Sequence, residues 1–155
     1  MQDISIMIDN TKFNYRVGLM IEKGNQVLIE FSPKIDFTTL PGGRVKIGED
    51  SITALKREMQ EEMHYELDEK EIELQGIMEN FFEFDNKNYH ELYFLYKMNL
   101  PVDDNRFPDN LNNYDSEADY YRWIDKSKLT EVNLLPKELL SLIDSTKFKH
   151  ILIKK

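Results

Sequence analysis

Residues 43–65 read GRVKIGEDSITALKREMQEEMHY, and this order of glycines, apolar residues and acids predicts a loop that leads into a helix. Asp50 and Ser51 are both residue types that cap helix N-termini. From Ile52 onward, apolar residues recur at the spacing of one buried helix face. We therefore expect a helix from about residue 50 to residue 63.

Three acids lie close together on this predicted helix. Because each residue of an α-helix turns about 100°, Glu61 and Glu62 lie at about −60° and +40° from Glu58. In water, like charges at these spacings repel by a few tenths of a kcal/mol per pair. A divalent cation converts that repulsion into coordination, and carboxylate oxygens suit Mg²⁺ or Mn²⁺. A run of acids on a helix is usually only a solvated face, and it is the residues around these three acids that move the interpretation toward a metal site.

The residues before the helix suit a phosphate ligand. Gly42 and Gly43 allow a tight turn in which the backbone approaches a ligand closely. Arg57 borders the acids, where it can orient them or meet a phosphate. Arg44, beside the glycines, is a candidate phosphate contact. Arg16, on an early strand, is the other arginine considered. Either arginine could equally be a surface charge, and only Arg44 is kept as a candidate.

Together these residues resemble the signature box of the Nudix hydrolases, a MutT-like family. Its pattern is G, five residues, E, seven residues, then R-E-U-x-E-E-x-G-U, where U is a bulky aliphatic residue. The positions that match are Gly43, Glu49, Arg57, Glu58, Met59, Glu61 and Glu62. The departures are His64, which stands in place of a glycine, and Tyr65, which stands in place of an aliphatic residue. At a helix C-terminus His64 is expected to adopt the left-handed conformation that glycine favours.

The resemblance implies a Mg²⁺- or Mn²⁺-dependent hydrolase that cleaves the pyrophosphate bond of a nucleoside diphosphate linked to another group. It implies that Glu58, Glu61 and Glu62 hold the metal, where it would neutralise charge at phosphorus and activate a water. Glu49 would orient this set of ligands. Some relatives also use an acid from a distant loop. The loop before the aromatic strand offers Asp115, Glu117 and Asp119 for this role, and Glu117 is the candidate.

The family fold implied is α/β, namely an α/β/α sandwich around a mixed sheet, and the pattern along the chain is compatible with it as a single domain over residues 1–155. Alternating apolar residues around Asp9-Asn10 predict a hairpin or two short strands, and Gly24-Asn25 indicates a second hairpin before residue 31. Phe37–Pro41 is expected to form a short strand into the glycine loop. Further expected elements are strands at about 72–84 and 89–99, a loop at 101–118, a strand at 120–124, short helices from residue 127 or 130 to about 143, and a last strand at 147–153.

Composition narrows the function class. The formal net charge of −9 argues against binding to nucleic acid, although a bound cation would still admit an anionic nucleotide. No apolar run reaches the 18 or so residues of a membrane span, and no export signal is visible. With no cysteine, the chain has neither disulfides nor thiolate sites, and we expect it in the cytoplasm. A homodimer is an expectation from the family alone.

Two other functions compete with hydrolysis. A Nudix-like sensor would bind a nucleotide without turnover, but such domains tend to lose carboxylates from the box, and none is lost here. A prenyl diphosphate isomerase on this fold is expected to need a cysteine, which this chain lacks. The substrate stays open among nucleoside triphosphates, nucleotide sugars and ADP-ribose. The aromatic residues between Phe81 and Phe94 are expected mainly to form core and strand pairs, and the three histidines are expected to be structural.

Overall fold

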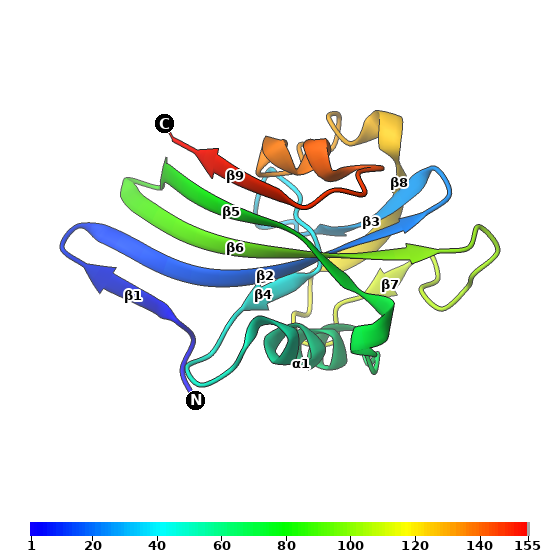
Figure 1. Ribbon diagram of the computed structural model, residues 1–155, viewed down its shortest axis with the longest axis horizontal. Helices are drawn as coiled ribbons and strands as arrows, with labels where there is room; N and C mark the ends of the chain where they lie inside the picture. The colour runs from blue at the N-terminus through cyan, green and yellow to red at the C-terminus, as the bar shows by residue number, and fades with distance from the viewer. Residues whose placement is uncertain (155) are drawn as a thin grey trace.

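In the computed structural model, which describes residues 1–154, one mixed sheet runs through the protein (Figure 1). Its main path has the strand order β7-β8-β3-β2-β6-β5-β9, and β1 and β4 also pair with β2. The strands are β1 (Ser5–Ile8), β2 (Thr11–Lys23), β3 (Gln26–Phe31), β4 (Gly42–Arg44), β5 (Glu73–Phe84), β6 (Lys87–Leu100), β7 (Leu111–Asn112), β8 (Tyr120–Asp125) and β9 (Lys149–Ile153).

The long strand β2 organises the sheet. Along one side it pairs in turn with β1, β4 and β3, all antiparallel, and along the other it pairs in parallel with β6. The predicted turns at Asp9-Asn10 and Gly24-Asn25 join β2 to its two hairpin partners, so both N-terminal hairpins are confirmed. β4 is thereby fixed against the middle of β2, and a six-residue loop leads from it to the helix at residues 51–63.

The two faces of the sheet carry separate hydrophobic cores. Helix α1 (Ser51–Met63) covers one face, where Leu55 and Met59 pack against strand residues such as Leu19. The 3₁₀ helix η3 (Lys137–Leu142) covers the other face, where Leu139 joins a second buried cluster. Figure 1 shows α1 and the orange η3 segment on opposite sides of the sheet. The layers predicted from the resemblance are therefore present.

One predicted strand is wrong. Phe37–Pro41 forms no strand and contains only isolated bridges at Thr38 and Thr39. The strand lies one step later, in β4, because its glycines let the backbone pair closely with β2. The short helices expected after residue 127 are present as 3₁₀ helices, η2 (Lys126–Lys128) and η3, in segments too short for several α-helical turns.

The remaining elements follow the prediction closely. The chain from 101 to 118 is mostly loop, with β7 as a two-residue strand inside it. A short 3₁₀ helix, η1 (Glu69–Glu71), leads from α1 into β5. Within residues 1–154, no helix has both the length and the apolar character that crossing a membrane requires.

Candidate active site

Helix α1 begins and ends as its sequence predicts. The Asp50 side chain accepts a hydrogen bond of 2.7 Å from the backbone N–H of Thr53, which caps the N-terminus. At the other end His64 takes left-handed backbone angles, φ 52° and ψ 36°, so the conformation expected at this departure from the box is confirmed. Its ring stacks on Tyr114, with centroids 3.8 Å apart and planes 8° apart. The stack links the helix end to the loop that precedes β8.

Both glycines of β4 are required by contacts at this point. Gly42 has φ +145°, and a Cβ there would lie 2.1 Å from the carbonyl oxygen of Val17. A Cβ on Gly43 would lie 2.5 Å from the carboxylate of Glu58. The carboxylate of Glu58 therefore rests directly on the β4 backbone, and a larger residue at position 43 would displace it.

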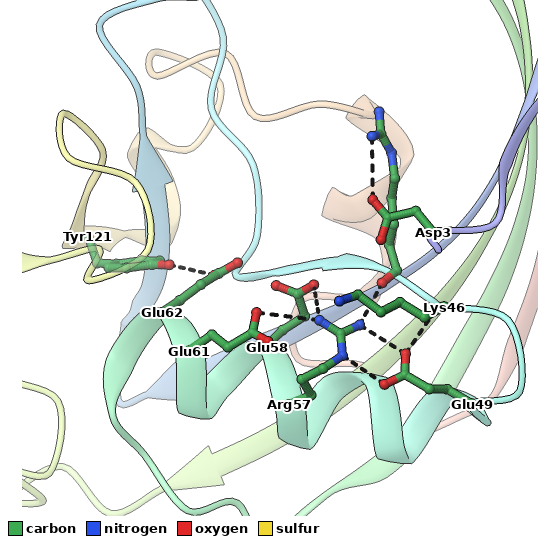
Figure 2. Close-up of polar contacts among 9 residues, drawn as sticks. Asp3, Lys46, Glu49, Arg57, Glu58, Glu61, Glu62 and Tyr121 are labelled. Carbon is green, nitrogen blue, oxygen red and sulfur yellow. Dashed lines mark hydrogen bonds and ion pairs between the residues drawn. The ribbon is translucent and has the colours of Figure 1, made fainter. Parts of the chain in front are cut away.

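Arg57 ties the loop and the helix together (Figure 2). Its guanidinium donates to both carboxylate oxygens of Glu49 at 2.7 and 2.9 Å, and to Glu58 at 2.9 Å. It also donates to the backbone carbonyl of Arg44 at 2.9 Å and approaches Glu61 at 3.5 Å. The hydrogen bonds from Arg57 lower the pKa of Glu49. Arg57 thus orients the acids of the box, and Glu49 in turn holds Arg57 in place.

The side chain of Arg44 takes no part in this cluster. Its guanidinium lies 3.8 Å from Asp3 and is 38% exposed, whereas its backbone carbonyl is the group that Arg57 contacts. The phosphate contact expected of Arg44 stays a prediction.

The three acids of the helix differ in environment. Glu58 and Glu62 are buried, at 9% and 7% exposure, whereas the side chain of Glu61 is 39% exposed. Glu62 accepts a hydrogen bond of 2.7 Å from the buried hydroxyl of Tyr121 on β8. The amide of Asn113 donates to that hydroxyl and to Glu30 on β3, both at 3.1 Å. A hydrogen-bonded chain of buried groups therefore runs from the helix to β3.

The two carboxylates in this hydrogen-bonded chain, Glu62 and Glu30, have too little positive charge nearby to offset the cost of ionising them. Burial, the neighbouring Glu58 and the charge of Glu30 raise the pKa of Glu62 well above its usual range. Burial, together with the charges of Asp119 and Glu58, raises the pKa of Glu30 to about 7, against the lowering effect of Asn113 and Arg16. A cation that binds beside such acids stabilises their ionised form.

The acids of the helix have the right chemistry for a hard divalent cation, since all are carboxylates and two are buried beside each other. Across residues 1–154, however, the side chains form no ready-made group of three metal ligands. Glu61 is turned toward Arg57, and Glu62 is bonded to Tyr121 (Figure 2). The donor set fits Mg²⁺ in type, and metal binding would require these side chains to leave their present partners.

Beside β4 lies a cleft of about 280 Å³, and its polar wall is formed by Arg16, Glu30, Thr39 and Asp119. The guanidinium of Arg16 sits 5.8 Å from the ring of Tyr93. Arg16, which was not kept as a candidate from the sequence, is thus the arginine whose side chain lines the cleft.

The loop before β8 contributes Asp119 to the cleft. Asp119 accepts a hydrogen bond of 2.7 Å from Ser116, and its other carboxylate oxygen is buried with no hydrogen-bond partner. Glu117, the candidate chosen from the sequence, is exposed, and the described residues show no hydrogen bond or ion pair to its side chain. The structure therefore brings Asp119, and not Glu117, to the cleft.

Sequence reasoning missed Glu30, Asn113 and Tyr121. Glu30 carried one visible indication, namely an acid within the apolar run of β3. Asn113 and Tyr121 carried none, because they reach the helix only through the pairing of β3 with β8.

Comparison with known families matches residues 12–143 to the model of the NUDIX domain. The chain belongs to the Nudix family. A search of curated proteins found no match. The family and the α/β fold inferred from the box are thereby confirmed, and with them the assignment of the chain to an enzyme family.

Solved structures of Nudix-type proteins share the fold at low sequence identity. A MutT protein from Bacillus halodurans aligns with a TM-score of 0.66 and 18% identity, covering 88% of this chain and 86% of its own. An Ap4A hydrolase from C. elegans aligns at 0.56 and 23%, covering 85% and 94%. A UDP-X diphosphatase aligns at 0.55 and 18%, covering 89% and 66%.

Proposed function

We propose that this Nudix protein is a Mg²⁺- or Mn²⁺-dependent hydrolase that cleaves a pyrophosphate bond in a nucleoside diphosphate linked to another group. The observation that carries the proposal is the Arg57 cluster, in which one guanidinium fixes Glu49 and Glu58 against the glycine backbone. Glu58 and Glu62 are buried beside each other, and Arg57 contacts only the first of them within the described residues. A helix with a merely structural role has no need of such a pair.

In this proposal Glu58, Glu61 and Glu62 would hold the metal. When bound, the metal would neutralise charge that develops at phosphorus and lower the pKa of a water. Arg57 keeps Glu58 oriented through a hydrogen bond of 2.9 Å, and Glu49 keeps Arg57 oriented through two more. Gly43 leaves the space that the Glu58 carboxylate occupies. These contacts hold Glu58 in place before substrate arrives, whereas Glu61 and Glu62 would leave their present partners when the metal binds.

The cleft beside β4 supplies groups for the phosphates and for the proton. Arg16 is the cation on its wall, so it would contact a phosphate oxygen. We assign the loop acid to Asp119 in place of Glu117, because its carboxylate lines the cleft and has one buried oxygen free of hydrogen bonds. In that position it would accept the proton of the attacking water.

The substrate class follows from the family at a coarse level. Two of the neighbours in fold are named for nucleotide substrates, Ap4A in one and UDP-X in the other. We therefore propose a nucleotide derivative as the substrate. Nucleoside triphosphates, nucleotide sugars and ADP-ribose form the panel to test.

The test measures the release of phosphate-containing product from this panel with Mg²⁺ or Mn²⁺. Glu61→Gln and Glu62→Gln should each lower kcat by about two to three orders of magnitude, while circular dichroism stays unchanged. Glu69→Gln is the matched control, since this exposed acid lies outside the box and its one ion pair within residues 1–154 is with Lys56 across 3.8 Å. Turnover at the wild-type level in both box variants would refute the site.

The same panel separates hydrolysis from sensing. Calorimetry that finds tight nucleotide binding by the wild-type protein, with no product after long incubation, would identify a Nudix-like sensor instead. A second result would also count against Asp119: if Asp119→Asn leaves kcat unchanged and Glu117→Gln lowers it, the loop acid is Glu117.

A further inference from the structure

The two residues at which the chain departs from the Nudix box contact the same loop. His64 and Tyr65 stand where the box has a glycine and an aliphatic residue. The ring of His64 stacks on Tyr114 with centroids 3.8 Å apart, and the ring of Tyr65 lies 4.8 Å from that of Phe107. Both partners belong to the segment 101–119, which runs from β6 to β8 and is mostly loop.

Tyr65 holds the first part of this segment. Its hydroxyl donates to the carboxylate of Glu71 at 3.0 Å and accepts a hydrogen bond of 3.1 Å from the guanidinium of Arg106. The buried ring of Phe107 packs against Tyr65, and the carbonyl of Phe107 accepts a hydrogen bond of 2.7 Å from the indole of Trp123 on β8. The substitution Tyr65→Leu would keep an apolar contact with Phe107 but would lose both hydrogen bonds of the hydroxyl.

His64 holds the second part of the segment, close to the acids of the box. Its ring and that of Tyr114 are nearly parallel, with planes 8° apart. The backbone N–H of Tyr114 also donates to the carbonyl of Glu62 at 2.9 Å, which gives a partner to a carbonyl in the last turn of the helix. His64 is exposed and Tyr114 is 58% exposed, so the stack buries little apolar area. What it fixes is the position of Tyr114 relative to the end of α1.

From Tyr114 the contacts lead directly to the cleft. The preceding residue, Asn113, donates its backbone N–H to the carbonyl of Asp119 at 3.0 Å, which closes the chain from 113 to 119 into a compact turn. Within this turn Ser116 binds Asp119 twice, because its carbonyl accepts from the Asp119 N–H at 3.1 Å and its hydroxyl donates to the carboxylate at 2.7 Å. The pairing of β7 with β8, which also holds this part of the chain, has only two residue pairs. A shift of Tyr114 would therefore move the carboxylate of Asp119.

We propose that His64 and Tyr65 are positioning residues that clamp the segment 101–119 onto the end of α1 and thereby hold Asp119 at the cleft. This inference rests on the proposed function, in which Asp119 accepts the proton of the attacking water. A general base must lie within hydrogen-bond reach of that water, and a displacement of about 1 Å can cost up to about 100-fold in rate. Arg16, the proposed phosphate contact, lies on β2 outside the segment, so the clamp should affect kcat and leave KM unchanged.

Substitutions that restore the pattern of the box test the clamp. In His64→Gly and in Tyr65→Leu, kcat on the substrate that the panel identifies should fall about tenfold, with KM unchanged. Glycine adopts the left-handed backbone of residue 64 without strain, so the urea midpoint of His64→Gly should stay near that of the wild type. A loss of kcat without a loss of stability is not expected of a merely structural contact. Tyr114→Phe keeps the stacking ring and should match the wild type, whereas Tyr114→Ala should lose as much kcat as His64→Gly.

Hydrogen exchange measures the clamp without turnover. The backbone N–H groups of Asn113 and Asp119 should exchange at least about tenfold faster in His64→Gly than in the wild type, because the turn is no longer held against the helix. The matched control is Phe148→Ala, which removes a ring of similar exposure, 53%, just before β9. It should change neither the exchange of these two groups nor kcat.

The remaining outcomes decide against the clamp or against its role. Unchanged exchange in His64→Gly would overturn the clamp whatever the activity. Faster exchange with an unchanged kcat, or with a higher KM alone, would overturn the positioning of Asp119. Losses of kcat that multiply in the double variant His64→Gly/Tyr114→Ala would show that the two rings act separately, which would also overturn it. If the wild type hydrolyses no member of the panel, the proposed function is refuted, and the exchange result still decides whether the clamp exists.

Discussion

Removing the Arg57 guanidinium should destabilise the protein far more than removing any ordinary surface cation. The side chains of Arg57, Glu49 and Glu58 are only 20%, 15% and 12% exposed. Arg57→Met would leave these two carboxylates facing each other without a cation, and breaking a buried pair in this way costs about 3–5 kcal/mol. Since the cluster is not fully enclosed, we expect about 3 kcal/mol.

The assay is urea unfolding in EDTA, followed by circular dichroism, so that no metal replaces the lost charge. For a protein of this size, 3 kcal/mol corresponds to a fall in Tm of roughly 6–12 °C. Lys56→Met is the control on the adjacent residue. Lys56 pairs with Glu69 across 3.8 Å, and both side chains are more than 40% exposed, so its removal should cost between about 0 and 1 kcal/mol.

A double-mutant cycle identifies the cause. Glu49→Gln in the Arg57→Met background should recover part of the lost stability, because one uncompensated charge disappears. Equal losses of stability in Arg57→Met and Lys56→Met would refute the reasoning. Strictly additive effects of the Glu49 and Arg57 substitutions would also count against it.

Three further predictions follow from the same geometry. Gly43→Ala should lower kcat at least about tenfold with the fold intact by circular dichroism, because its Cβ would displace the Glu58 carboxylate. Without metal, the free energy of unfolding should fall as pH rises from about 4.5 to about 7, since the folded state retains the proton of Glu30 that the unfolded state releases; Glu30→Gln should flatten this slope in urea titrations. Tyr114→Ala should cost about 0.5–1.5 kcal/mol through the lost stack on His64, and an unchanged urea midpoint would contradict it.

The sequence predicted those parts of the site that depend on residues close together in the chain. Asp50 caps α1, and His64 takes the left-handed conformation, because both depend on backbone contacts within a few residues. The spacing of Arg57 and Glu49 likewise brought the two together through one loop and two helical turns. The sequence could not decide whether Arg16 or Arg44 lines the cleft. That choice depends on which side of β2 faces a cleft built from other strands.

Long-range pairing created the rest of the site. Tyr121 reaches Glu62 across 59 residues of sequence, and Asn113 reaches Glu30 across 83. These contacts exist because β8 pairs with β3, and that pairing leaves no periodic mark near either residue. For the same reason, aromatic spacing alone did not separate Asp119 from Glu117, since the turn held by Ser116 decides which acid lines the cleft.

The protein treats its buried acids differently on the two sides of the sheet. Glu22, at 4% exposure, is paired with Lys97 at 2.5 Å and with Lys126 at 2.8 Å. Glu62, at 7% exposure, has the neutral hydroxyl of Tyr121, and the described residues include no ion pair to it. A fold that supplies two lysines to one buried acid has the means to neutralise another. Leaving Glu62 without a protein cation weakens the metal-free fold, and this cost is best explained by a cation that arrives from solution. Added Mg²⁺ should therefore raise Tm, and Glu62→Gln should abolish most of that rise.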